Sequence, residues 1–167
     1  MFDFLKKKIQ YESLNIENNK ITSLGNGQLI PIENVKDEMF AQKMLGDSIA
    51  FEFKGNNVDI FSPCNGELSV LFPTGHAFGI TSEDGVEILV HIGVNTVNNK
   101  GVGFKLLDKK QGDKVKAGDP IVSVDFDKLS KTYDMSTMLI ITNSNDLKIN
   151  FKRIGEVKRE SIVGTIE

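Results

Sequence analysis

The sequence predicts an all-β protein, an antiparallel β-sandwich or barrel of many short strands with one or two short helical turns. Three observations support this fold class. Short apolar and β-branched runs follow one another along most of the chain, turn signals rich in glycine and asparagine separate them, and no long run has a helical period. A fold built from strand–helix–strand units is therefore not expected.

The expected strands begin at Gly27 and end at Ile154. Turn dipeptides such as Asn65-Gly66 and Asp84-Gly85 mark the breaks between them. In order, the predicted strands are Gly27–Ile32, Ser48–Phe53, Val58–Phe61, Gly66–Phe72, Ala77–Ser82, Val86–Ile92, Gly103–Leu107, Lys114–Val115, Pro120–Val124, Met138–Thr142 and Lys148–Ile154.

Two segments between these strands are expected to form short helical turns. The first is Asp37–Leu45, where Asp37 is a candidate N-cap and Phe40, Met44 and Leu45 would share one side. The second is Phe126–Tyr133.

The length of 167 residues suits one domain, expected over residues 19–167 after a flexible tail of residues 1–18. In the tail, Phe2, Leu5 and Ile9 have the spacing of a short amphipathic helix, with three lysines between the last two. Such a helix could rest weakly on an anionic membrane, but so short a helix is marginal in water and a frayed terminus is the alternative.

Composition narrows the function classes. A net charge of −3 argues against nucleic-acid binding, which needs clustered positive charge, and suits a basic protein partner. Cys64 is the single cysteine, so no internal disulfide can form, a reducing compartment is expected, and the thiol is interpreted as structural. No apolar run approaches the ~20 residues of a membrane span, so we expect a cytoplasmic protein.

The chain has two histidines, His76 and His91, on either side of a predicted hairpin. A turn centred between Glu83 and Asp84 places them directly opposite each other, and one centred between Asp84 and Gly85 makes them diagonal neighbours. A register with an odd residue between them would put them on different faces. We expect one of the first two registers, with the rings within reach of each other.

Strand alternation places Val86, Ile88 and Val90 on one face as a core stripe. His91 then shares the other face with Leu89, on the outside or in a cleft, where a partner could meet it.

Two neighbouring imidazoles suit phosphoryl transfer. A neutral imidazole is a nucleophile towards phosphorus, and a second ring can donate a hydrogen bond to the transferred group. Thr74 could orient His76. Two surface histidines without chemistry are an alternative, and a zinc site would need about four ligands, so it would require groups from a partner.

Several segments resemble enzyme IIA of the glucose class, from the bacterial phosphoenolpyruvate-dependent sugar phosphotransferase system. The segments are Phe40-Ala41-Gln42-Lys43-Met44-Leu45-Gly46-Asp47, Ser62-Pro63-Cys64-Asn65-Gly66, His76-Ala77-Phe78-Gly79-Ile80, Gly85-Val86-Glu87-Ile88-Leu89-Val90-His91-Ile92-Gly93-Val94-Asn95-Thr96-Val97, Gly101-Val102-Gly103-Phe104, and Gly112-Asp113-Lys114-Val115-Lys116-Ala117-Gly118-Asp119. The resemblance covers roughly residues 27–160.

The resemblance implies a cytoplasmic phosphoryl carrier. His91 would accept phosphate from the carrier protein HPr and pass it to a cysteine on the IIB domain of a sugar permease. His76, held by Thr74, would stabilise the phosphoryl group. An apolar patch would dock both partners, and its matching positions are Phe40, Met44, Leu45, Phe72, Phe78, Leu89 and Val97.

Further expectations concern cofactors, assembly and charge. No cofactor is obligatory, a zinc ion at His76 and His91 is expected only in a partner complex, and the chain is expected to be a monomer. Asn95 and Asn145 stand where the family commonly has acids at the docking surface, and their loss could weaken association with a basic partner.

Two other function classes are alternatives. One is a regulatory module that binds metabolic enzymes or permeases according to its phosphorylation state. The other is a metal-dependent wall hydrolase or a biotinyl carrier. The hydrolase would need a His-x-His pair where this chain has His91-Ile92-Gly93, and the carrier would need a lysine between methionines, which is absent.

Overall fold

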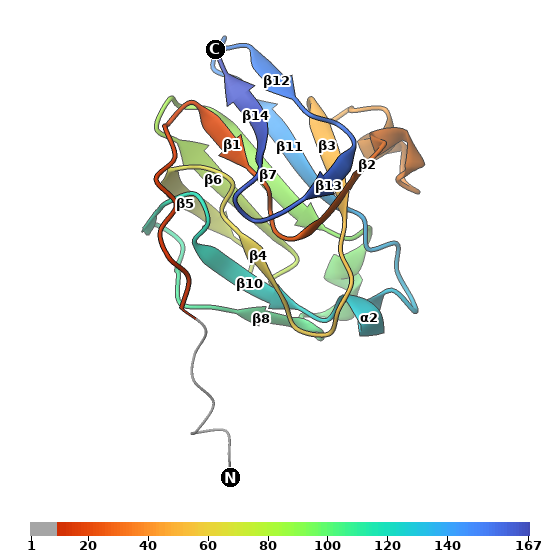
Figure 1. The fold of residues 1–167 in the computed structure, drawn as a ribbon. Helices are drawn as coiled ribbons and strands as arrows, with labels where there is room; N and C mark the ends of the chain where they lie inside the picture. The colour runs from red at the N-terminus through yellow and green to blue at the C-terminus, as the bar shows by residue number, and fades with distance from the viewer. Residues whose placement is uncertain (1–9) are drawn as a thin grey trace.

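Antiparallel β-strands make up most of the regular secondary structure in the computed structural model, which describes residues 10–167 (Figure 1). The strands are β1 (Lys20–Thr22), β2 (Gly27–Ile30), β3 (Ser48–Glu52), β4 (Val58–Phe61), β5 (Gly66–Leu71), β6 (Ala77–Ser82), β7 (Glu87–Ile92), β8 (Phe104–Leu106), β9 (Lys114–Val115), β10 (Pro120–Val124), β11 (Thr137–Asn143), β12 (Ile149–Phe151), β13 (Gly155–Val157) and β14 (Ile162–Ile166). The helical elements are α1 (Glu38–Ala41), α2 (Phe126–Leu129) and two 3₁₀ turns, η2 (Ile32–Asn34) and η3 (Thr96–Asn99). The expected all-β class with short helical turns is confirmed.

The strands form one large sheet and two small ones. The large sheet has the order β13-β2-β3-β11-β7-β6-β5-β9, and the small sheets are β1-β14-β12 and β4-β10-β8. All three sheets contribute to one buried cluster, in which Phe51 and Phe78 of the large sheet join Ile60, Val122 and Val163 of the small ones. The small sheets therefore cover one face of the large sheet, which makes the fold a sandwich.

The opposite face of the large sheet carries a second, smaller cluster. Ala50, Met138 and Ile140 point to this side from β3 and β11, and Phe40 of α1 and Ile32 of η2 cover them. These central strands are therefore apolar on both faces. The helical turns between β2 and β3 cover this second face, and they place α1 over β7.

Strand alternation in β7 agrees with the prediction. Ile88 and Val90 enter the main core, as does Val86 just before the strand. Leu89 packs against the second cluster, and His91 lies on the same face and is half-buried. The site thus lies beside the second cluster, next to α1.

The first helical segment is shorter than expected. Asp37 is its N-cap, as predicted, and the Asp37 carboxylate accepts a hydrogen bond from the Met39 amide. The helix ends at Ala41, and Lys43 adopts a left-handed conformation with φ of 56°. Phe40 is buried, whereas Met44 is exposed, so the two do not share one helical side.

Residues 10–18, which were expected to belong to the tail, lie against the sandwich. The Tyr11 hydroxyl donates to Asp59 at 2.7 Å, Arg159 donates to the Glu12 carbonyl at 2.9 Å, and Asn65 donates to the Ile16 carbonyl at 2.9 Å. This part of the chain is anchored. The expected amphipathic helix of Phe2, Leu5 and Ile9 lies outside the described residues. Within the described part, no helix is long and apolar enough to cross a membrane.

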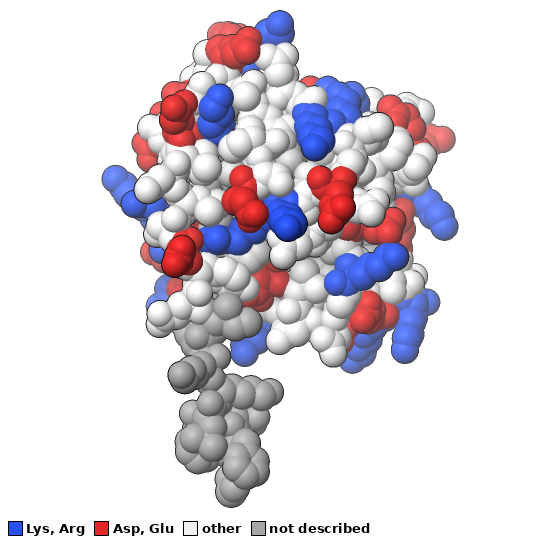
Figure 2. Space-filling model, viewed as in Figure 1, with Lys and Arg blue, Asp and Glu red and all other residues white. Residues whose placement is uncertain are grey.

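Charged side chains are mixed on the face drawn in Figure 2. Lysine and arginine lie among aspartate and glutamate there, without gathering by sign. This distribution fits the mild net charge of −3.

Candidate functional site

The two histidine rings meet at one end of the β6–β7 hairpin. Ala77 lies opposite His91 and Phe78 lies opposite Val90. This register centres the turn on Asp84, so neither of the two expected registers is correct. The rings nevertheless lie edge-on, with centroids 5.4 Å apart and planes at 79°, so the predicted proximity is confirmed.

A tight turn before β6 places His76 next to His91. The alternation of a regular strand does not. His76 precedes β6, and its carbonyl accepts a hydrogen bond from the Ile92 amide at 2.7 Å. The turn closes with a bond from the Gly75 amide to the Phe72 carbonyl at 2.9 Å. Gly75 has φ of +76°, and a Cβ atom there would lie 2.9 Å from Cβ of Phe104. The turn therefore depends on glycine.

The His76 ring is fixed from two sides. Its Nδ1 lies 2.6 Å from Oγ1 of Thr74, and the Phe72 ring stacks on it with centroids 5.1 Å apart and planes at 6°. Thr74 is therefore placed as the sequence predicted. When the Thr74 hydroxyl donates to Nδ1, the proton of the neutral ring sits on Nε2 and is free to be donated.

The His91 ring has a defined tautomer. Its Nδ1 lies 2.7 Å from the Gly93 carbonyl oxygen, which can only accept, so we assign the proton to Nδ1. The lone pair is then on Nε2. Gly93 has φ of +80°, and a Cβ atom there would lie 2.5 Å from Cγ2 of Thr96 and 2.8 Å from Sδ of Met135.

The surroundings of both rings favour the neutral form. Burial lowers the pKa of His76, and the neighbouring His91 lowers it further. Burial also lowers the pKa of His91, and the hydrogen bond to Gly93 and the charge of Asp37 oppose this in part. Both rings are therefore mostly uncharged near neutral pH.

Asp37 is a site residue that sequence reasoning did not identify beyond its role as a helix cap. Its charge acts on His91, and the same helix brings the Phe40 ring within 5.1 Å of the His91 ring. The cap signal was readable in the sequence. What the sequence did not show is that α1 folds over the face of β7 that carries His91.

Comparisons with known proteins agree with this geometry. The family model of the phosphoenolpyruvate-dependent sugar phosphotransferase system, EIIA 1, matches residues 19–147. The chain belongs to this EIIA family.

Individual relatives support the family assignment. A glucose-specific EIIA component of Mycoplasma capricolum is 38% identical over 90% of this chain and 97% of its own length. One of Halalkalibacterium halodurans is 39% identical over 87% of this chain and 83% of its own. The glucose-specific EIICBA component of Streptococcus pneumoniae is 39% identical over 89% of this chain, which spans only 20% of that longer protein.

A solved structure shows the same fold. Glucose permease IIA from Mycoplasma capricolum superposes with a TM-score of 0.77 at 38% identity, covering 87% of this chain and 93% of that one.

Most of the apolar side chains expected at the docking surface of this EIIA domain are accessible. The exposed fractions are 66% for Met44, 38% for Leu45, 39% for Phe72 and 50% for Val97. Leu89 is partly buried against the second cluster, and Phe40 is almost fully buried in it. Met39, at 48%, is an exposed apolar residue of α1 that the sequence analysis did not include.

Phe78 was wrongly placed in this surface. Its side chain is fully buried in the main core, on the face of β6 covered by the small sheets. The observed register accounts for this burial, because Phe78 lies opposite Val90, a core residue, and not opposite His91.

The two asparagines expected beside the site lie far apart. Asn95 is exposed, caps η3 in a left-handed conformation, and follows His91 by four residues. Asn145 instead donates to the Asp84 carbonyl at 3.1 Å, at the turn end of the hairpin. Because β11 runs antiparallel to β7, Met138 pairs with His91, and the chain has reached the opposite end by Asn143. Asn145 is therefore not part of the site.

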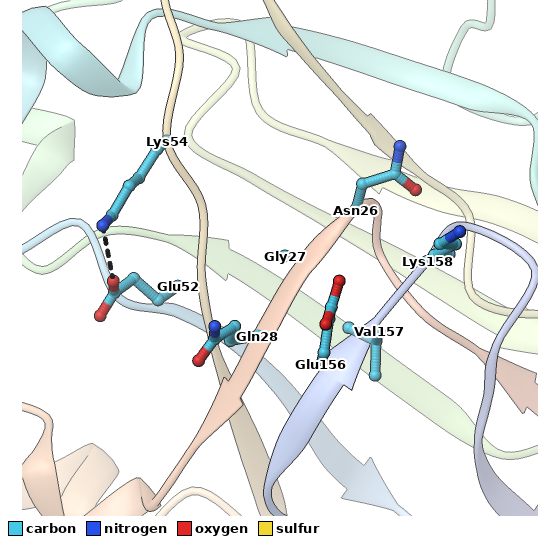
Figure 3. A pocket seen from close by; sticks show the side chains of 8 residues that line it. All are labelled: Asn26, Gly27, Gln28, Glu52, Lys54, Glu156, Val157 and Lys158. Atoms are coloured by element: carbon cyan, nitrogen blue, oxygen red, sulfur yellow. Dashed lines mark ion pairs between the residues drawn. The ribbon is translucent and has the colours of Figure 1, made fainter.

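Other features of the described chain are separate from the histidines. Figure 3 shows a hollow at β2, β3 and β13, where Lys54 pairs with Glu52 at 3.9 Å and no histidine takes part. Cys64 is buried, and burial raises its pKa to about 12, which agrees with a structural thiol. Among the described residues, no three potential ligands gather into a metal site.

Proposed function

We propose that this EIIA domain carries a phosphoryl group on Nε2 of His91, accepting it from phospho-HPr and donating it to a cysteine of the IIB domain of a sugar permease. The observation that carries the proposal is the bond from Nδ1 of His91 to the Gly93 carbonyl. It leaves Nε2 unprotonated and fixes the direction of its lone pair.

The transfer balances without proton loss from His91. The Nε2 lone pair attacks phosphorus, and the phosphorus–nitrogen bond to the HPr histidine breaks. His91 keeps its Nδ1 proton, donated to Gly93, and becomes a phosphohistidine. In the second step a IIB cysteine thiolate attacks the same phosphorus, and the bond to Nε2 breaks, which returns His91 to its starting tautomer.

His76 would steady the phosphoryl oxygens. Its ring lies edge-on to His91, and when the Thr74 hydroxyl donates to Nδ1, Nε2–H is the available donor. Buried, pre-oriented donors are worth more than donors in water because they need no reorganisation during the transfer. The stacked Phe72 ring limits rotation of the donor.

Both partners would dock on the exposed apolar side chains around the site. Met44, Leu45, Phe72 and Val97 leave apolar surface uncovered, a feature that generally marks a partner surface, and the Phe72 ring stacks on His76. We place this exchange in the cytoplasm. The relatives are named glucose-specific, so the IIB domain of a glucose permease is the partner to test first.

Transfer of radiolabelled phosphate from phospho-HPr tests the assignment. We expect the wild-type protein to take up label and His91→Ala to take up none. His76→Ala should fold and should be impaired in passing label to IIB. Because the chain has only these two histidines, full labelling of His91→Ala would overturn the assignment. Thermal unfolding of each variant would show that the loss is chemical.

Two finer expectations stay predictions. A zinc ion bound by His76 and His91 would need further ligands from a partner, because the two rings supply only two. Regulatory binding to other enzymes gains no specific support from the relatives, whose names describe components of the phosphotransferase system.

A further inference from the structure

Asp134 links two separate segments that both contact His91. Asp134 lies in the loop between α2 and β11 and is half-buried. Its Oδ2 accepts the Lys36 amide at 3.0 Å, across 98 positions of the sequence. Its Oδ1 accepts the Ser136 amide at 2.9 Å and the Ser136 hydroxyl at 2.7 Å. Both carboxylate oxygens are therefore in use.

One arm of this link reaches the hydrogen bond that sets the His91 tautomer. The carboxylate shapes the turn from Asp134 to Ser136. The carbonyl of Asp134 accepts the Val94 amide at 2.8 Å, and the carbonyl of Ser136 accepts the Gly93 amide at 3.0 Å. Gly93 in turn offers its carbonyl to Nδ1 of His91. The turn from Asp134 to Ser136 therefore positions Gly93, and the Gly93 carbonyl positions the His91 ring.

The other arm reaches α1. Lys36 immediately precedes Asp37, the N-cap of the helix. From that helix, Phe40 contacts the His91 ring and the Asp37 charge acts on it. Holding the Lys36 amide therefore fixes where α1 begins relative to β7.

The carboxylate is charged when it makes these contacts. Burial alone would raise the pKa of Asp134, but hydrogen bonds from the Ser136 hydroxyl and from the Lys36 and Ser136 amides outweigh it and hold the pKa below the usual value. Hydrogen bonds to an ionised acceptor are about twice as strong as neutral ones.

We propose that Asp134 is a positioning residue for phosphoryl acceptance, which joins the start of α1 to the loop that holds Gly93 and so sets His91 from both sides. The proposal rests on the function proposed above. Asp134 itself need not touch the phosphoryl group or the partner. Its effect passes through His91 and through the helix at the docking surface.

Two variants of Asp134 separate its contact with Lys36 from its contacts with Ser136. Asp134→Asn keeps one oxygen for Ser136 and replaces the other with an amide nitrogen, which cannot accept from Lys36. It should raise KM for phospho-HPr and leave the His91 tautomer unchanged. Asp134→Ala removes both arms. It removes all three hydrogen bonds to the carboxylate, so it should lower kcat/KM at least tenfold, which is about the effect of losing one charge-assisted hydrogen bond alone, and should mix the His91 tautomers.

The tautomer is read from the ¹⁵N shifts of the two His91 ring nitrogens in the unphosphorylated, full-length protein. Asp127→Ala is the matched control, because the Asp127 carboxylate also accepts a backbone amide across the fold, that of Gly55 at 2.9 Å, and Asp127 lies in α2. We expect it to lose stability without a change in tautomer or KM.

Wild-type tautomer and kinetics in Asp134→Ala would overturn the proposal, and so would equal changes in Asp127→Ala. If the wild-type protein took no label from phospho-HPr, the proposed function would fail. The tautomer shifts would still decide whether Asp134 positions His91.

Discussion

The Thr74 hydroxyl oxygen lies 2.6 Å from Nδ1 of His76, in the turn that brings His76 to His91. The contact orients the ring and, when the hydroxyl donates, leaves the ring proton on Nε2. Without it, the Phe72 stack would restrain only the plane of the ring.

Thr74→Val should therefore slow the transfer of phosphate from phosphorylated protein to IIB by about tenfold, the effect of one lost hydrogen bond to a buried group. Thr74→Ser, which keeps the hydroxyl, should restore most of the rate. Thr142→Val is a matched control, because Thr142 also donates through its hydroxyl, to the Glu87 carbonyl at 3.3 Å, on an exposed part of β11. A wild-type rate in Thr74→Val would contradict the role given to Thr74.

The pH dependence of phosphate uptake should reflect the lowered pKa of His91. Only the neutral ring is a nucleophile, and burial lowers its pKa from 6.5. Uptake should therefore persist as the pH falls to 6.5 and should decline only below it. NMR titration of His91 would give the midpoint directly, and a midpoint at or above 6.5 would contradict the buried, neutral site.

The same pKa directions predict how stability changes with pH. Both rings resist protonation in the folded state, whereas an unfolded chain binds these protons near pH 6.5. The free energy of unfolding should therefore fall as the pH drops below 6.5, and level off once the folded rings are also protonated. Urea unfolding from pH 7.5 to 5 would measure this, and His76→Ala should show a smaller fall.

The sequence predicted most strands because apolar alternation survives in them. It missed β14, in which Gly164 interrupts the apolar run, and the closely packed Phe151 leaves no room for a side chain there. It also missed two strands of three residues each, β1 and the edge strand β13, in which Val157 is the one buried side chain. None of these three patterns differs from a loop until its neighbour in the sheet is known.

The site was predictable in its chemistry and less so in its geometry. Two histidines around one hairpin identified the pair, but the register depended on a turn centred on Asp84, which dipeptide signals do not determine. That one-residue shift moved Phe78 into the core. The position of Asn145 depends on the direction of β11, and the position of Asp37 depends on the packing of α1. Both are tertiary features.

Asn95→Asp should speed association with phospho-HPr. Asn95 is exposed and left-handed, with φ of 61°, a conformation that aspartate also tolerates. A new negative charge near His91 should attract a basic partner and raise the association rate a few-fold, about as expected for one charge at an interface rim, with loss of the gain at high salt.

Asn145→Asp is the matched control for that experiment. It adds the same charge at the far end of the hairpin, beside the Asp84 carbonyl. Stopped-flow association should show no comparable gain. An equal gain in both variants would mean that net charge decides the rate, and would contradict the local role of Asn95.

Arg159 should hold the segment of residues 10–18 on the sandwich. Its guanidinium lies 4.9 Å from the Tyr11 ring centroid and 5.1 Å from that of Phe61, and it donates to the carbonyls of Glu12 and Gly118. Arg159→Ala should lower the free energy of unfolding by about 2 kcal/mol, from the cation–π contacts and hydrogen bonds together. Arg159→Lys should recover only part of this, since a lysine cannot make the forked contact.

Limited proteolysis distinguishes anchoring from general stability. Arg159→Ala should be cut within residues 10–18 under conditions that leave the wild-type protein intact, while His91 still takes up phosphate. Arg153→Ala is the control, because Arg153 also lies over an aromatic ring, Phe151 at 5.8 Å, and bonds the Ser48 carbonyl, but touches none of this segment. It should lose stability without the new cleavage. Protection of residues 10–18 in Arg159→Ala would show that Tyr11 and its bond to Asp59 hold the segment without the arginine.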